Sequence, residues 1–210
     1  MKRTFGIFIA AYAAVLFGSF ARASTTYSIQ PPTVGATRGD VGDAFDVVLT
    51  NNGPSSISVA GFFFEVSVTD PDITLTGADF STGAFTYIFA GDSFDQSNSL
   101  PLNFTSGQTL DGSDSTNDGA GITLTSGESL ALGRVLFNIS PTAATGPFTV
   151  SFTGGTDSNN LSNPAGGPVS VDNFTSGTIT ITSSTVPEPA SLFLVLGGMA
   201  ALVVRRRRLS

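Results

Sequence analysis

The chain has 210 residues, a formal net charge of −7, and no His, Cys or Trp. The commonest general base, the thiolate nucleophile and the best transition-metal ligands are therefore missing, which argues against most enzyme classes. Residues 24–186 hold fifteen of the sixteen acidic residues but two of the nine basic ones, a net charge of −13. Such a field repels phosphate backbones and attracts cations or basic partners, so we expect no nucleic-acid partner.

The length allows one medium domain with short appendages. We predict a signal peptide at 1–23, a β-domain at 24–183 and a C-terminal sorting segment at 184–210. A domain of about 160 residues buries close to 70% of its unfolded surface, so it does not need disulfides. The lack of Cys is therefore compatible with export.

The N-terminus has the three parts of a secretory signal. A positively charged start precedes the apolar stretch 5–20, and the small residues Ala21 and Ala23 stand just before Ser24. Signal peptidase accepts only short side chains at these two positions. We predict cleavage after Ala23; the alternative is an uncleaved N-terminal anchor, because the apolar part is slightly long.

Between the two ends, the hydrophobic pattern is typical of β-strands. Apolar residues alternate with polar ones, as expected for strands with one buried face. Turn-forming segments at 51–54, 69–72, 145–147 and 154–157 separate the strands. The alternating residues are Phe45, Val47 and Leu49; Phe62, Phe64, Val66 and Val68; Ile73 and Leu75; Phe148, Val150 and Phe152; and Ile179 and Ile181.

The pattern shifts phase once, within residues 130–139. Leu130 and Leu132 fall on even positions, whereas Val135 and Phe137 fall on odd ones. An extra residue keeps both groups on the buried face, so we predict a β-bulge at Gly133-Arg134. Many strands with frequent turns favour an all-β fold, an antiparallel sandwich of two sheets, with the abundant Phe between them.

The densest group of oxygen ligands lies at 111–119. Asp111, Asp114 and Asp118 suggest a weak calcium site, since hard cations need clustered oxygens. An EF-hand is rejected because Thr125 stands where the loop needs a bidentate Glu, and no helices flank it. We prefer to interpret the segment as a solvated acidic turn, with the calcium site as the alternative, and we expect no other cofactor.

Glu65 and Glu128 are the two glutamates of the central domain, so a two-carboxylate glycosidase would draw on them or on an Asp. The phase of its strand places Glu65 on the solvent side, and no proton-transfer pair is apparent. We therefore assign no catalytic residues. A carbohydrate-binding surface is weakened by the absence of Trp and by having only Tyr27 and Tyr87 in the domain, although Phe could substitute.

The C-terminus combines a proline-stiffened tag, an apolar segment and a basic tail. The segment 190–204 would form a helix of roughly 22 Å, which crosses a hydrocarbon core of ~30 Å only with local adjustment. The tail acts as a stop-transfer signal and keeps its own end cytoplasmic, leaving the domain outside. The tag is Val186, Pro187, Glu188 and Pro189, and the tail is Arg205, Arg206, Arg207 and Arg208.

This order of tag, apolar helix and arginines resembles the PEP-CTERM sorting signal of bacterial exported proteins. The resemblance covers about the last 25 residues. It implies recognition by an exosortase, removal of the membrane helix, and release or transfer of the domain to the cell surface or an exopolysaccharide matrix. The alternative is a permanent C-terminal anchor.

The segments 41–49, 59–66 and 130–137 resemble strands of cohesin-like sandwiches. That resemblance implies a jelly-roll of about nine strands and a role in binding another protein, and it transfers no partner-binding residues. We therefore expect a non-catalytic exported surface or matrix protein whose sandwich is a structural or adhesion module. The alternative is a binding module for exopolysaccharide or a surface protein.

Overall fold

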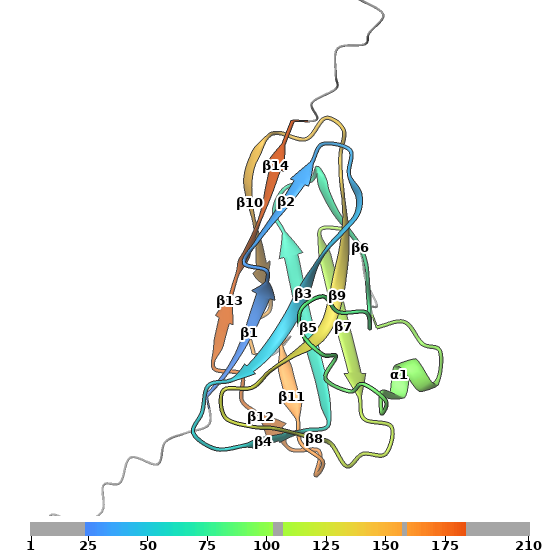
Figure 1. The fold of residues 1–210 in the computed structure, drawn as a ribbon, viewed down its shortest axis with the longest axis vertical. Coiled ribbons are helices and arrows are strands. Elements are labelled where there is room, and N and C mark those ends of the chain that lie inside the picture. Colours follow the sequence, from blue (N-terminus) through green and yellow to red (C-terminus); the bar gives the residue numbers. More distant parts are fainter. Residues whose placement is uncertain (1–23, 103–106, 157–158, 184–210) are drawn as a thin grey trace, which may run out of the picture.

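The computed structural model describes residues 24–102, 107–156 and 159–183, which form a β-sandwich (Figure 1). This agrees with the predicted all-β class. The predicted signal peptide, its cleavage residues Ala21 and Ala23, and the segment 184–210 with the tag and arginine tail lie outside these ranges, while Ser24 is the first residue inside. No helix in the three ranges is long and apolar enough to cross a bilayer.

The first sheet has the strand order β13-β1-β3-β9-β6. The pairing of β1 with β13 is parallel, and the other neighbours are antiparallel. Because β1 and β13 come from the two ends of the domain, their pairing closes the fold. The bounds are β1 (Thr25–Gln30), β3 (Val41–Asn51), β6 (Ile73–Asp79), β9 (Ser129–Ile139) and β13 (Asn173–Thr175).

The second sheet has the order β12-β11-β5-β10-β14-β2, and β7 pairs with the other side of β5. Strands β14 and β2 are parallel. The bounds are β2 (Thr33–Thr37), β5 (Gly61–Val68), β7 (Thr109–Ser115), β10 (Gly146–Phe152), β11 (Asn160–Ser162), β12 (Pro168–Val169) and β14 (Gly177–Thr182).

A separate ribbon joins β4 (Ile57–Val59) to β8 (Ile122–Leu124). The described residues thus form fourteen strands rather than about nine. The difference comes from short pairings such as β4 with β8 and β11 with β12, in which connecting segments satisfy their backbone groups with each other.

The core lies between the two sheets and is built by the predicted alternation. In β3, Phe45, Val47 and Leu49 are fully buried, and in β5 Phe64 and Val66 are fully buried. Phenylalanine also fills the core as expected, because four of the five largest fully buried side chains are Phe and the fifth is Tyr. These five are Tyr27, Phe45, Phe64, Phe89 and Phe137.

The predicted bulge is confirmed, centred one residue earlier than expected. Val47 pairs with Gly133 and Val48 with Ala131, so Leu132 is the extra residue of β9. Ala131, Leu132 and Gly133 are all buried. The bulge therefore keeps Leu132 and the later alternating residues in one core.

The bulge also sets the direction of Arg134. Val135 and Phe137 lie in the core, so Arg134 lies on the outer face of the first sheet, opposite Asp46 of β3. Without the extra residue, the phase of β9 would turn this guanidinium toward the core.

A segment between β6 and β7 packs beside β9. Ile88 donates its backbone N–H to the Ala131 carbonyl (2.8 Å), and Ala131 donates to the Thr86 carbonyl (2.9 Å). The segment then forms α1 (Phe94–Ser97), a short helix that sequence periodicity did not predict and that lies at the side of the sandwich (Figure 1). Ser93 caps it by accepting a hydrogen bond from Gln96 N (2.9 Å).

Candidate functional site

Asp114, one of the three predicted calcium ligands, is buried and accepts four hydrogen bonds. Its Oδ2 accepts from the Tyr87 hydroxyl and from Ser93 Oγ, each at 2.5 Å. Its Oδ1 accepts from the backbone N–H groups of Asp95 (3.1 Å) and Ser115 (2.7 Å). These donors occupy the carboxylate, so Asp114 anchors the segment that leads into α1.

The structure does not bring the three predicted calcium ligands together. Asp111 and Asp114 are three residues apart on β7, and an odd separation places their side chains on opposite faces. Asp118 lies beyond the strand, in an exposed turn where it accepts from Ala120 N. Within the three described ranges, no group of three acidic side chains has a geometry that could hold a metal ion.

Two further carboxyl groups have pKa values raised by burial and by neighbouring negative charge. Burial, together with the negative charge of Asp114, raises the pKa of the Asp95 carboxyl. Burial and the neighbouring Asp40 raise the pKa of Asp43 in the same way. Both groups hold a proton more readily than a free aspartate does.

The two glutamates of the domain accept hydrogen bonds from hydroxyl and backbone N–H groups. Glu65 is half-buried rather than fully solvated, and its Oε1 accepts from the Thr153 hydroxyl. Glu128 Oε2 accepts from the N–H (2.7 Å) and the hydroxyl (2.8 Å) of Thr125, and these hydrogen bonds lower the pKa of Glu128. A carboxyl group with a lowered pKa is a poor general acid at neutral pH.

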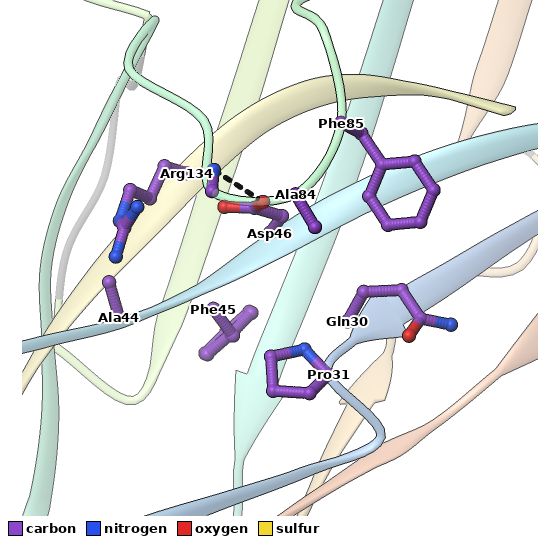
Figure 2. Close-up of a pocket in the computed structure, with 9 residues that line it drawn as sticks. Gln30, Pro31, Ala44, Phe45, Asp46, Ala84, Phe85 and Arg134 are labelled. Carbon is purple, nitrogen blue, oxygen red and sulfur yellow. Dashed lines mark hydrogen bonds between the residues drawn. The ribbon is translucent and has the colours of Figure 1, made fainter.

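A hollow of about 390 Å³ lies on the outer face of the first sheet (Figure 2). Its floor is the part of β3 around Ala44 and Asp46, and the loop 83–85 rises over it. Gln30, the last residue of β1, and Pro31 after it line the hollow below the loop in Figure 2. This volume is within the range of small-ligand sites, about 300–1,000 Å³.

Two residues of opposite charge, Asp46 and Arg134, lie beside Gly83 in the loop of this hollow. Gly83 donates its N–H to Asp46 Oδ2 (2.7 Å), which ties the loop to β3. A methyl group placed on Gly83 would come within 3.1 Å of that oxygen and 3.5 Å of Arg134 Nη1. The glycine thus lies beside both charged groups.

The hollow is also lined by a cationic side chain, Arg134, and an aromatic one, Phe85. Across the described ranges, the half-buried Arg134 guanidinium makes no hydrogen bond and no ion pair, whereas Arg38 Nε donates to the Ala143 carbonyl (2.6 Å). Phe85 is also half-buried, and Figure 2 shows its ring on the opposite side of the hollow from Arg134. Tyr27 and Tyr87, by contrast, are buried in the core.

Sequence reasoning did not single out this hollow. The phase shift that predicted the bulge contained a usable signal, because it moves Arg134 to the outer face. Asp46 was a second usable signal, because it is a charged residue within a largely apolar strand. The loop 83–85, which completes the hollow, has no periodicity that could have placed it.

A comparison with known protein families identifies a sorting motif at the C-terminal segment. Residues 185–208 match the PEP-CTERM protein-sorting motif. This motif is characteristic of exported proteins that are anchored in the membrane before processing. No curated protein matches the sequence.

Solved structures similar to the sandwich are cohesin domains. The sixth cohesin of scaffoldin B from Acetivibrio cellulolyticus, solved with a dockerin, has a TM-score of 0.54 and 19% identity, covering 76% of this chain and 99% of that one. A cohesin from Clostridium acetobutylicum has a TM-score of 0.54 and 13% identity, covering 79% and 94%. A type I cohesin–dockerin complex from Clostridium thermocellum gives 0.51 and 12%, covering 76% and 99%. The chain therefore has a cohesin-like fold and carries a PEP-CTERM motif.

Proposed function

We propose that this protein is exported through its N-terminal signal, cut by signal peptidase after Ala23, and held in the membrane by residues 190–204. An exosortase then processes the C-terminal segment and leaves the sandwich at the cell surface or in the extracellular matrix. One observation carries the proposal: the last described strand ends at Thr182, and the sorting motif begins at residue 185. The motif therefore follows the folded domain directly.

We further propose that the sandwich is a non-catalytic module that binds a surface protein. The cohesin-like fold supports this role, since two of the similar cohesins were solved in complex with a dockerin. The described carboxyl groups support it as well, because Asp114, Glu65 and Glu128 accept hydrogen bonds that hold the fold rather than forming a proton-transfer pair. A carbohydrate-binding role associated with exopolysaccharide is the second candidate, and the hollow at Arg134 favours it.

The sorting part is tested by changing the tag alone. Cells with and without an exosortase would express the full chain or a variant with Pro187, Glu188 and Pro189 all changed to Ala, with S184A as the control. We expect the wild type and the control to leave the membrane fraction at reduced mass only when the exosortase is present. The triple variant should stay in the membrane at its larger mass. A triple variant that leaves the membrane like the wild type would contradict the proposal.

The binding part is tested by measuring the adhesion of cells that carry the sandwich at their surface. Cells that retain the wild-type sandwich at their surface should adhere to one another or to the matrix more than cells that do not express the chain. Equal adhesion of the two strains would contradict a binding role.

A further inference from the structure

We propose that the hollow at Asp46, Phe85 and Arg134 binds a sugar unit of a neutral polysaccharide. This inference rests on the second candidate function and narrows it to one site, but it does not depend on the sorting proposal, because it is argued from the outer face of the first sheet alone. It assigns a ligand class to the surface shown in Figure 2.

The hollow offers both a hydrogen-bond acceptor and several donors. Asp46 is 5% exposed, and one of its oxygens accepts from Gly83 N (2.7 Å) while the other accepts none from the described residues. Arg134 lies opposite Asp46 in the register of β3 and β9, with its guanidinium donors unused within the described ranges. A sugar hydroxyl both donates and accepts, so this pairing of groups suits adjacent hydroxyls of one ring.

The side of the hollow away from Arg134 carries an aromatic ring. Figure 2 shows the Phe85 ring on the loop with the Gln30 side chain on the same side, whereas Ala44 lies beside Arg134. The C–H face of a pyranose packs against such a ring while its hydroxyl groups remain directed at polar partners. The hollow therefore offers one ring for stacking, with hydrogen-bonding groups around it.

Charge selects a neutral polymer over an acidic one. Arg134 lies between two carboxylates, Asp46 on β3 and Asp79 on β6, in the strand register. A uronate placed on Arg134 would meet both of them, and its polymer would approach a domain whose residues 24–186 carry a net charge of −13. A neutral chain avoids both costs and still uses the guanidinium.

The experiment is affinity electrophoresis of the full chain in a zwitterionic detergent without a sugar headgroup. Native gels would contain dissolved mixed-linkage glucan, xyloglucan, galactomannan or dextran, with alginate as the acidic polymer and a polymer-free gel as reference. We expect at least one neutral polymer to slow the wild-type chain, and alginate to leave it unchanged. No retardation by any of the four neutral polymers, or retardation by alginate alone, would overturn the proposal.

Two pairs of variants locate the binding. F85A and R134M remove the stacking and hydrogen-bonding sides, and we expect each to weaken retardation about tenfold. F94A and R38M change an exposed aromatic residue on α1 and the other arginine of the domain, and they should be retarded like the wild type. Thermal unfolding checks that all four variants fold. Folded F85A and R134M proteins that bind as tightly as the wild type would overturn the assignment of this hollow.

Discussion

Replacing Asp114 by Asn tests whether this buried carboxylate holds the segment before α1 in place. Asparagine keeps the size of the side chain but has one oxygen instead of two. If that oxygen accepts from Tyr87 and Ser93, the amide NH₂ must face the N–H groups of Asp95 and Ser115. Two hydrogen bonds to a charged acceptor thus become contacts between two donors.

The size of the effect follows from the number of hydrogen bonds lost. A hydrogen bond to a charged group contributes about 1.5–3 kcal/mol, so losing two costs at least about 3 kcal/mol. Removing the charge also relieves its repulsion of Asp95, which offsets part of this cost. We therefore expect D114N to lower the free energy of unfolding by about 3 kcal/mol. In a domain of about 160 residues, this corresponds to a fall in Tm of about 6–12 °C.

The assay is thermal unfolding of the full chain followed by far-UV circular dichroism. D118N is the matched control, because Asp118 is exposed and its charge changes by the same amount. We expect the control to stay within about 2 °C of the wild type, as is usual for surface substitutions. A D114N protein that also melts within about 2 °C of the wild type would refute the anchoring role.

Three further predictions concern packing, pH and calcium. A Cβ on Gly112 would lie 2.3 Å from Phe64 Cζ, so G112A should lower the free energy of unfolding by about 1–3 kcal/mol, whereas a Cβ on Gly35 meets nothing within 4 Å and G35A should be near neutral in the same denaturant titration. The pKa values of Asp43 and Asp95 are raised in the folded protein, so each group destabilises the fold when it is ionised. This penalty disappears as the pH falls through the folded pKa toward the pKa of the unfolded chain. We therefore expect the Tm of the wild type to increase relative to that of a double Asn variant of these two residues as the pH is lowered from 7 toward the ordinary aspartate value of about 3.9; an unchanged difference between the two proteins would contradict the assignment. Adding millimolar calcium should leave Tm unchanged, and an increase of several degrees that chelator reverses would show a site that the described geometry does not contain.

Local pattern predicted the strands whose two faces differ. The alternation through Phe45 and Phe64 placed β3 and β5 correctly, and the phase shift near Leu132 revealed the bulge, because burial of one face imposes a period of two on the residues. The same reasoning indicated the aromatic core.

The strand β7 shows why part of the fold and of the candidate site could not be predicted. Its sequence, from Thr109 to Ser115, is rich in Asp, Gly and Ser, which are depleted in strands, and it reads as a turn. It forms a strand because β5 offers a full edge of backbone partners, and Gly112 leaves room for the Phe64 ring. Pairing across the sheet therefore outweighs local propensity and buries Asp114, which the sequence pattern had placed in a solvated cluster.

The hollow could not be predicted from the sequence for the same reason. Asp46, Gly83 and Arg134 come from two strands and a loop, and only the register of β3 with β9 brings them together. A register of this kind depends on contacts between distant parts of the chain, which no local pattern contains.

The mass of the native protein, purified from the surface fraction of its own cells, tests the central claim most directly. Intact-mass spectrometry should find a chain that begins at Ser24 and has lost the apolar segment 190–204 together with the arginine tail. A chain that still runs from Met1 to Ser210, or one found in the cytosol, would contradict the account of export and sorting.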